Sequence, residues 1–88
     1  MQYKVTIKNK AVKQSMTIPP RDREKVYDGI KKLENSETWG DVRRLVNHIY
    51  DYRLRVGNYR ALFNIIDSQL EIKEISVEEI KKRDDHTY

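Results

Sequence analysis

The sequence predicts a single α+β domain, residues 1–88, in which N-terminal helices pack on one face of a small, mostly antiparallel twisted sheet. Two observations predict this class. One alternating segment and two segments of helical spacing fill the first half of the chain, and alternating segments follow one another through the second half. A chain of 88 residues buries only somewhat above ~60% of the surface that its unfolded form exposes, so its margin of stability is thin.

The first half of the chain predicts one strand and two helices. In residues 2–7 an apolar side chain occupies every second position, as in a half-buried strand: Tyr3, Val5 and Ile7. Residues 9–16 have weak helical character, with Asn9 as a possible N-cap. Pro20 can occupy the first turn of the next helix, residues 20–34. Apolar side chains recur in that helix at i, i+4 and i+7: Val26, Ile30 and Leu33.

The stretch YRLRVGNYR, from Tyr52 to Arg60, predicts a β-hairpin. Its alternating runs flank Gly57 and Asn58, and a two-residue loop that opens with Gly is typical of a type II′ turn. That turn fixes the facing pairs and makes one side of the sheet apolar: Val56 with Tyr59, Leu54 with Ala61, and Tyr52 with Phe63. The pairs on the other side are Arg53 with Leu62 and Arg55 with Arg60. Like charges that face each other are destabilising, which raises the question of which anion offsets their repulsion.

The sequence predicts the secondary structure of the segments around the hairpin less clearly. Residues 41–49 have apolar positions at spacings that fit either a helix or a strand. Strands are predicted over 50–56 and 59–66. A turn is predicted at Asp67 and Ser68, and a further strand begins at Leu70.

The tail ISVEEIKKRDDHTY allows two interpretations. Ser76 and Glu79 match a capping box, which would start a short helix. Alternatively, the strand continues past Val77 with an irregularity. Basic and aromatic side chains crowd the last eight residues: Lys81, Lys82, Arg83, His86 and Tyr88. A frayed basic terminus without a site is the simpler alternative.

Composition restricts the class of protein. The chain has no cysteine, so neither a disulfide framework nor a thiolate metal site is expected, and an intracellular, cytoplasmic location follows. No apolar run approaches the roughly 20 residues of a membrane span, and the N-terminus has no apolar stretch typical of a signal peptide. No His, Asp and Glu cluster has metal-ligand spacing, so no metal and no cofactor are predicted.

The basic residues are unevenly distributed. The net charge is +4, from 18 Lys plus Arg against 14 Asp plus Glu. The stretch from Arg43 to Arg60 holds five arginines, no lysine and one acid, Asp51. Arginine binds phosphate bidentately, so this cluster favours phosphate recognition. A solvated charged face is the alternative.

The remaining aromatic and histidine residues need no function. We expect His48 to be a packed or surface histidine and Trp39 to form a lid on the core. Tyr3 and Tyr27 have apolar spacing. The hairpin aromatics are expected in the core because the register puts them on the apolar side: Tyr52, Tyr59 and Phe63.

The segments WGDVRRLVN and YRLRVGNYRALFNI, followed by a basic tail that ends in Tyr, resemble the RelE/ParE superfamily of type II toxin-antitoxin toxins, in its RelE-like branch. The resemblance implies a ribosome-dependent endoribonuclease, or mRNA interferase, that cuts mRNA in the decoding (A) site without a metal and inhibits translation. It also implies three partners: a RelB-like antitoxin, the ribosome and mRNA. The alternatives are a ParE-like inhibitor of DNA gyrase and a non-catalytic nucleic-acid-binding module.

The resemblance also implies roles for single residues. Arg53 and Arg55 match the two basic positions of the first hairpin strand, where the best-known members carry lysines, and Arg60 matches the arginine of the second. Arg83 matches the family's arginine that follows the last strand, with Lys82 as the alternative. Tyr88 matches the C-terminal tyrosine, and His86 resembles the C-terminal histidine of other ribosome-dependent toxins.

Metal-free cleavage of RNA requires a base for the 2′-hydroxyl, cations for the pentacovalent phosphorus and an acid for the leaving 5′-oxygen. A guanidinium is a poor base, whereas the ordinary pKa of histidine, about 6.5, suits this role. The predicted catalytic residues are Arg55, Arg60, Arg83, His86 and Tyr88. The predicted nucleic-acid-binding residues are Arg43, Arg44, Arg53, Lys81 and Lys82.

Overall fold

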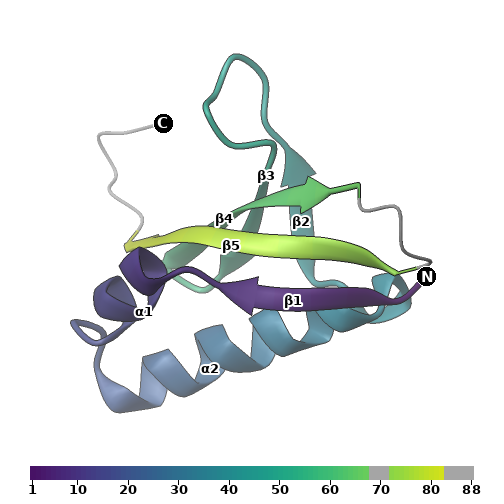
Figure 1. The fold of residues 1–88 in the computed structure, drawn as a ribbon. Helices are drawn as coiled ribbons and strands as arrows, with labels where there is room; N and C mark the ends of the chain where they lie inside the picture. Colours follow the sequence, from purple (N-terminus) through teal and green to yellow (C-terminus); the bar gives the residue numbers. More distant parts are fainter. Residues whose placement is uncertain (68–71, 83–88) are drawn as a thin grey trace.

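A computed structural model describes residues 1–67 and 72–82. These residues form a five-stranded sheet in the order β1-β5-β4-β3-β2, together with two α-helices (Figure 1). The elements are β1 (Tyr3–Ile7), α1 (Asn9–Ser15), α2 (Pro20–Lys31), the 3-10 turns η1 (Lys32–Glu34) and η2 (Ser36–Thr38), β2 (Asp41–Arg44), β3 (Tyr52–Val56), β4 (Tyr59–Ile66) and β5 (Lys73–Lys82). The predicted α+β class is confirmed.

The sheet is mixed. β1 pairs with β5 in parallel, whereas the pairs β5–β4, β4–β3 and β3–β2 are antiparallel. The helix α2 runs beneath the sheet (Figure 1) and contributes Val26 and Ile30 to the core. The shorter α1 contacts β5. There, the Gln14 side chain accepts a hydrogen bond from the backbone N–H of Ile80, at 2.7 Å, three residues beyond the last β5 residue paired with β1.

The hairpin has the predicted register. All five facing pairs from Tyr52 with Phe63 to Val56 with Tyr59 are present. Gly57 has a φ of +57°, and Asn58 is not among the described residues with positive φ, which fits the predicted type II′ turn. The apolar side of the hairpin faces the core, where Phe63 is fully buried and its ring stacks on Tyr52 with centroids 5.4 Å apart.

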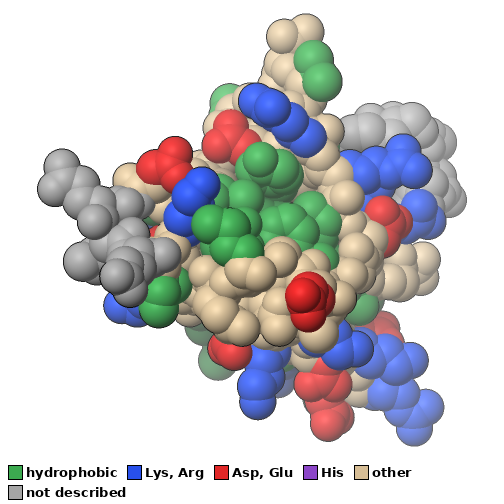
Figure 2. Space-filling view, turned by 90° about the vertical axis from the view of Figure 1, so that its right-hand side faces the viewer, with side chains coloured by type: hydrophobic (Ala, Val, Ile, Leu, Met, Phe, Trp, Pro, Cys, Tyr) green, Lys and Arg blue, Asp and Glu red, His purple; other side chains and the backbone are tan. Residues whose placement is uncertain are grey.

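Aromatic rings close one end of the core. Trp39 lies 5.3 Å from Tyr3 and 6.2 Å from Phe63 between ring centroids, and its indole N–H donates to the carbonyl of Leu33. The position of Trp39 over the core agrees with the predicted lid. From the side on which β1 begins, hydrophobic side chains are visible at the surface between charged ones (Figure 2).

Three sequence expectations are corrected or decided by the structure. Asn9 is the first residue of α1 rather than its N-cap, and Lys8 at the cap position makes no side-chain cap. The undecided segment 41–49 is β2 followed by a loop. The predicted helix from Ser76 is wrong, because these residues extend β5.

Pairing with β4 explains why the capping-box pattern fails. Leu62 faces Glu79 and Phe63 faces Val77, so Glu78 is an extra residue that forms a bulge. The alternative prediction, a strand that continues with an irregularity, is therefore confirmed. The predicted turn residue Ser68 and the predicted strand start at Leu70 lie outside the described residues.

Within 1–67 and 72–82, neither helix has the length and apolar character that a membrane crossing requires.

Candidate nucleic-acid interface

The face of the sheet opposite the core carries a row of cations. The strand registers align Asp41, Arg55, Arg60 and Lys81 across β2, β3, β4 and β5. Neighbouring strands are about 4.8 Å apart, so three cations follow one another at close spacing. We call Arg55, Arg60 and Lys81 the cation row.

The members of the cation row differ in exposure. Arg55 is exposed and the Lys81 side chain is 51% exposed, whereas Arg60 is only 9% exposed. The predicted facing pair of arginines is present, and Lys81 extends it to a third strand.

A second row on the same face consists of Arg43, Arg53, Leu62 and Glu79. The Arg53 guanidinium donates to the backbone carbonyl of Asp41 at 3.2 Å and lies 3.5 Å from its carboxylate. Arg53 is therefore partly neutralised at the β2 edge, while the cation row beside it supplies most of the positive charge of this face.

The structure brings together five of the ten predicted site residues on this face: Arg43, Arg53, Arg55, Arg60 and Lys81. Arg44 faces Tyr52, and Lys82 faces Tyr59, so both align with the core side of the sheet instead. The other three predicted residues lie outside the described part of the chain: Arg83, His86 and Tyr88.

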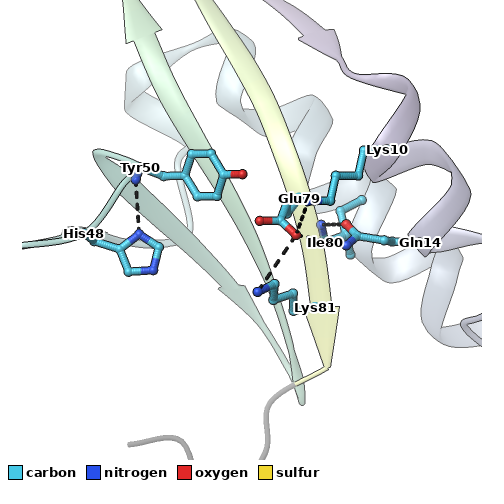
Figure 3. A network of polar contacts seen from close by, with 7 residues as sticks. All are labelled: Lys10, Gln14, His48, Tyr50, Glu79, Ile80 and Lys81. Carbon is cyan, nitrogen blue, oxygen red and sulfur yellow. Dashed lines mark hydrogen bonds and ion pairs between the residues drawn. The ribbon is translucent and has the colours of Figure 1, made fainter.

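The carboxylate of Glu79 lies beside Lys81 of the cation row (Figure 3). The side chain of Glu79 is buried, at 8% exposed. Lys10 Nζ lies 3.2 Å and Lys81 Nζ 3.8 Å from its Oε1 atom, and the Gln14 amide donates to the same oxygen at 3.1 Å. Burial alone would raise the pKa of Glu79, but hydrogen bonds from Tyr50, Gln14 and Lys10 and the charge of Lys81 lower it to about 2.

The loop between β2 and β3 projects beyond the sheet (Figure 1) and contacts this carboxylate through Tyr50. The hydrogen bond to Glu79, together with burial, raises the pKa of Tyr50, so its hydroxyl keeps its proton and is unsuited to act as a base. The backbone N–H of Tyr50 donates to His48 Nδ1 at 3.1 Å. The loop is also fixed at its base, where Asp51 N donates to the Asn64 side chain at 2.8 Å.

Two exposed apolar residues mark the tip of this loop. Val46 is 85% and Ile49 is 80% exposed, and Asn47 between them has a left-handed φ of +54°. His48 is also exposed, as the surface interpretation expected.

Sequence reasoning missed Glu79 and the residues that hold it. One signal was available: if residues 76–82 had been assigned to a strand, Glu79 and Lys81 would have been placed on one face. No pattern in the sequence indicates that Lys10, Gln14 and Tyr50 converge on that carboxylate, because they come from α1 and from a loop without periodicity.

The cations of this face suit a phosphate ligand, since fixed guanidinium and ammonium groups bind phosphate oxygens. In the described part of the chain, no group of three or more His, Cys, Asp or Glu side chains is arranged to hold a metal ion.

Comparison with known proteins gives matches among solved structures. No protein-family model matches the chain, and no curated protein matches it significantly. A chain of the archaeal RelE–RelB complex of Pyrococcus horikoshii OT3 is 26% identical with a TM-score of 0.74, over 97% of this chain and 99% of that one.

Two further structures share the fold at lower identity. The toxin–antitoxin complex RelBE2 of Mycobacterium tuberculosis matches with 21% identity and a TM-score of 0.74, over 94% of this chain and 100% of the other. The RelB–RelE complex of Methanococcus jannaschii matches with 20% identity and a TM-score of 0.64, over 86% and 87%.

The fold of this chain is similar to that of chains found in these toxin–antitoxin complexes. The comparisons support the assignment of this chain to the RelE-like toxin superfamily, and the resemblance stated from the sequence is confirmed.

Proposed function

We propose that the protein is the toxin of a type II toxin-antitoxin system and that it inhibits translation as a ribosome-dependent endoribonuclease. In this proposal it cuts mRNA in the decoding (A) site without a metal. The observation that carries the proposal is the cation row, which three neighbouring strands fix on one face of a RelE-like fold.

The cation row would stabilise the transition state of RNA cleavage. Attack by the 2′-oxygen places extra negative charge on a pentacovalent phosphorus, and cations that are already in position stabilise that charge without reorganising. Arg55 and Arg60 take this role, and Lys81 contributes from β5. The phosphate thereby relieves the repulsion between the facing arginines.

The proton transfers belong, in this proposal, to the C-terminal residues. His86 is the base for the 2′-hydroxyl because an imidazole exchanges protons near neutral pH. Tyr88 stacks on a base of the RNA or assists proton transfer. Arg83 joins the cations around the phosphate.

The ribosome supplies orientation in this mechanism. The described face has cations for phosphate but few groups that could hold a ribose in an attack-ready geometry, and such positioning accounts for a large part of a catalytic effect. Purified RNA should therefore be cut poorly, whereas an mRNA codon held by the ribosome should be cut readily.

We further propose an antitoxin as partner. The neighbouring structures are complexes of RelE with RelB. For this chain we expect an acidic antitoxin with a disordered segment that folds onto the sheet and helices and covers basic and apolar surface together.

Primer extension on an mRNA that is translated in the presence of the protein tests the proposal. We expect cuts in register with codons, loss of these cuts with Arg55→Ala, and their retention with Arg21→Ala, which removes an exposed arginine from α2. Intact mRNA together with broken DNA would instead identify a gyrase inhibitor. Rapid, codon-independent degradation of purified RNA would contradict the dependence on the ribosome.

A further inference from the structure

Glu79 is an anion placed among the cations that are expected to bind RNA. Its side chain is 8% exposed, and Lys10 from α1 and Lys81 from β5 both lie within 4 Å of its Oε1 atom. A carboxylate withdrawn this far from water is costly unless charged or polar partners surround it. The two ammonium groups, with Gln14 and Tyr50, are those partners.

The strand register brings this carboxylate next to the cation row. Glu79 and Lys81 are two residues apart on β5 and therefore share the basic face. Arg60 faces Lys81 across the β4–β5 ladder, which makes it the diagonal neighbour of Glu79. Diagonal neighbours are about 7–8 Å apart at Cα, a distance that long side chains span.

We propose that Glu79 is a specificity-determining residue of the basic face, where its carboxylate is an internal counter-anion that holds the cations in place and competes with RNA phosphate for them. This inference rests on the proposed function. The competition weakens binding of free RNA, which must displace the carboxylate with phosphates presented at low concentration. A codon held in the ribosome presents its phosphate at high effective concentration and overcomes the same competition.

Repulsion among the cations of the basic face explains why a carboxylate lies between them. Arg55, Arg60 and Lys81 would repel one another without an anion on this face, since like charges opposed across a sheet are destabilising. Lys10 from α1 adds a further positive charge beside Glu79. The Glu79 carboxylate relieves part of this repulsion within the folded protein. In this proposal, the Glu79 carboxylate is one of the anions that offset the repulsion between the facing arginines.

Binding of a single-stranded RNA decamer with 2′-O-methyl groups tests the inference, because its blocked 2′-oxygens cannot attack. The dissociation constant is measured against salt concentration for the wild type, Glu79→Gln and Glu24→Gln. Glu24 is an exposed residue of α2, so its substitution gives the same change of net charge away from the face. Glutamine keeps the shape of Glu79 and can still accept the Tyr50 hydrogen bond.

We expect Glu79→Gln to bind on the order of threefold to tenfold more tightly than Glu24→Gln at low salt, with a log–log salt slope steeper by about 0.7, as for one additional phosphate contact. Equal affinities and slopes for the two variants would overturn the inference. Failure of both the wild type and Glu79→Gln to bind at low salt would mean that the basic face does not bind RNA phosphate and would overturn the proposed function as well, so the two failures are distinguishable.

A second comparison uses Lys10, and its first part, in the wild-type background, does not depend on the folding of Glu79→Gln. Lys10 is 65% exposed, and Lys10→Met should weaken binding less than twofold in the wild-type background because Glu79 already occupies this ammonium group. In the Glu79→Gln background the same substitution should weaken binding severalfold. A loss from Lys10→Met alone as large as that from Arg55→Ala would show that Lys10 is available to phosphate and would contradict the proposal.

Discussion

Arg55 and Arg60 occupy equivalent positions in the hairpin, yet their surroundings differ. The facing-pair rule alone predicts the same result for both substitutions. Arg55 is exposed, whereas Arg60 is 9% exposed, so the aliphatic part of Arg60 belongs to the packed structure. In Arg60, the charge lowers the stability of the fold by repulsion, and the packed stem raises it.

Alanine substitutions should separate the two contributions. Arg55→Ala should leave the free energy of unfolding unchanged or raise it by up to ~1 kcal/mol, because it removes one member of a like-charge pair. Arg60→Ala should lower it by about 1 to 3 kcal/mol, because packing of its stem is lost. Chemical denaturation measures both.

Activity should respond alike at the two residues. A preorganised cation at a developing oxyanion contributes about 3 to 4 kcal/mol, so each substitution should lower ribosome-dependent cleavage on the order of a hundredfold to a thousandfold. If Arg55→Ala destabilises the fold by more than ~1.5 kcal/mol and loses activity only in proportion to unfolding, the residue is structural and the proposed site is misplaced.

Glu79 makes the stability of the fold depend on pH. Its pKa is about 2 in the folded protein against an ordinary 4.5, so the folded state is stabilised above about pH 4.5, and this stabilisation is lost as the pH falls toward 2. Between about pH 5.5 and pH 3 the loss should be about 2 kcal/mol.

The measurement is urea denaturation of the wild type and Glu79→Gln across that range of pH. The wild-type free energy of unfolding should fall more steeply than that of the variant, by about the 2 kcal/mol assigned to Glu79. Parallel curves would mean that the carboxylate is not held by the partners described above. Glu24→Gln is the control and should follow the wild type.

At the scale of elements, the close approach of α2 to the hairpin depends on one glycine. A Cβ atom at Gly29 would lie 2.8 Å from Val56 Cγ2 and 3.4 Å from Leu54 Cδ2. Val56 is β-branched and stiff, so it cannot easily give way. The glycine therefore sets the distance between α2 and β3.

Gly29→Ala should destabilise the protein although alanine is the better helix former. The gain in helix propensity is about 1 kcal/mol, and overpacking against a stiff side chain costs about 1 to 3 kcal/mol. We expect a net loss of about 1 kcal/mol. In a double-mutant cycle with Val56→Ala, the two substitutions should be coupled by at least ~0.5 kcal/mol; additive effects would show that the contact is not tight.

The end of β5 also depends on another element. Beyond the last residue that pairs with β1, the backbone N–H of Ile80 donates to the Gln14 side chain. A helix side chain thus continues the hydrogen bonding of the sheet and, through its amide N–H, holds Glu79 in the same contact. Through Gln14, α1 therefore helps to fix the position of Glu79 on the basic face.

At the scale of the whole molecule, the core cluster of the described residues runs from Ala11 to Ile80, and a short terminal segment contributes little to a core. Deletion of residues 86–88 should therefore change the melting temperature by less than about 4 °C, the shift that ~1 kcal/mol gives in a domain of this size. Ribosome-dependent cleavage should be abolished, because the proposed base His86 is lost. A large drop in melting temperature would mean that these residues are structural.

Growth provides the matching test in bacteria. Expression of the full chain alone should slow growth, and expression of the truncated chain should not. Comparable levels of the two proteins in the cell are the control. Unimpaired growth at high expression of an unmutated full chain would contradict the toxin proposal.

The sequence by itself determined the hairpin, its register, the facing arginines and the core residues of the hairpin. These features follow from an alternation of period two and from a glycine turn, and both act between residues close in the chain. The resemblance to RelE-like toxins could also be stated from the sequence, because the hairpin carries it.

Only the tertiary structure decided the rest. Residues 41–44 became an edge strand because β3 was available to pair with them, and the capping-box pattern at Ser76 lost to pairing with β4 and β1. The carboxylate of Glu79 gained its partners from α1 and the β2–β3 loop, up to 69 positions away for Lys10. Such long-range contacts leave no local period in the sequence, because their geometry is set by the packing of whole elements rather than by the neighbours of each residue.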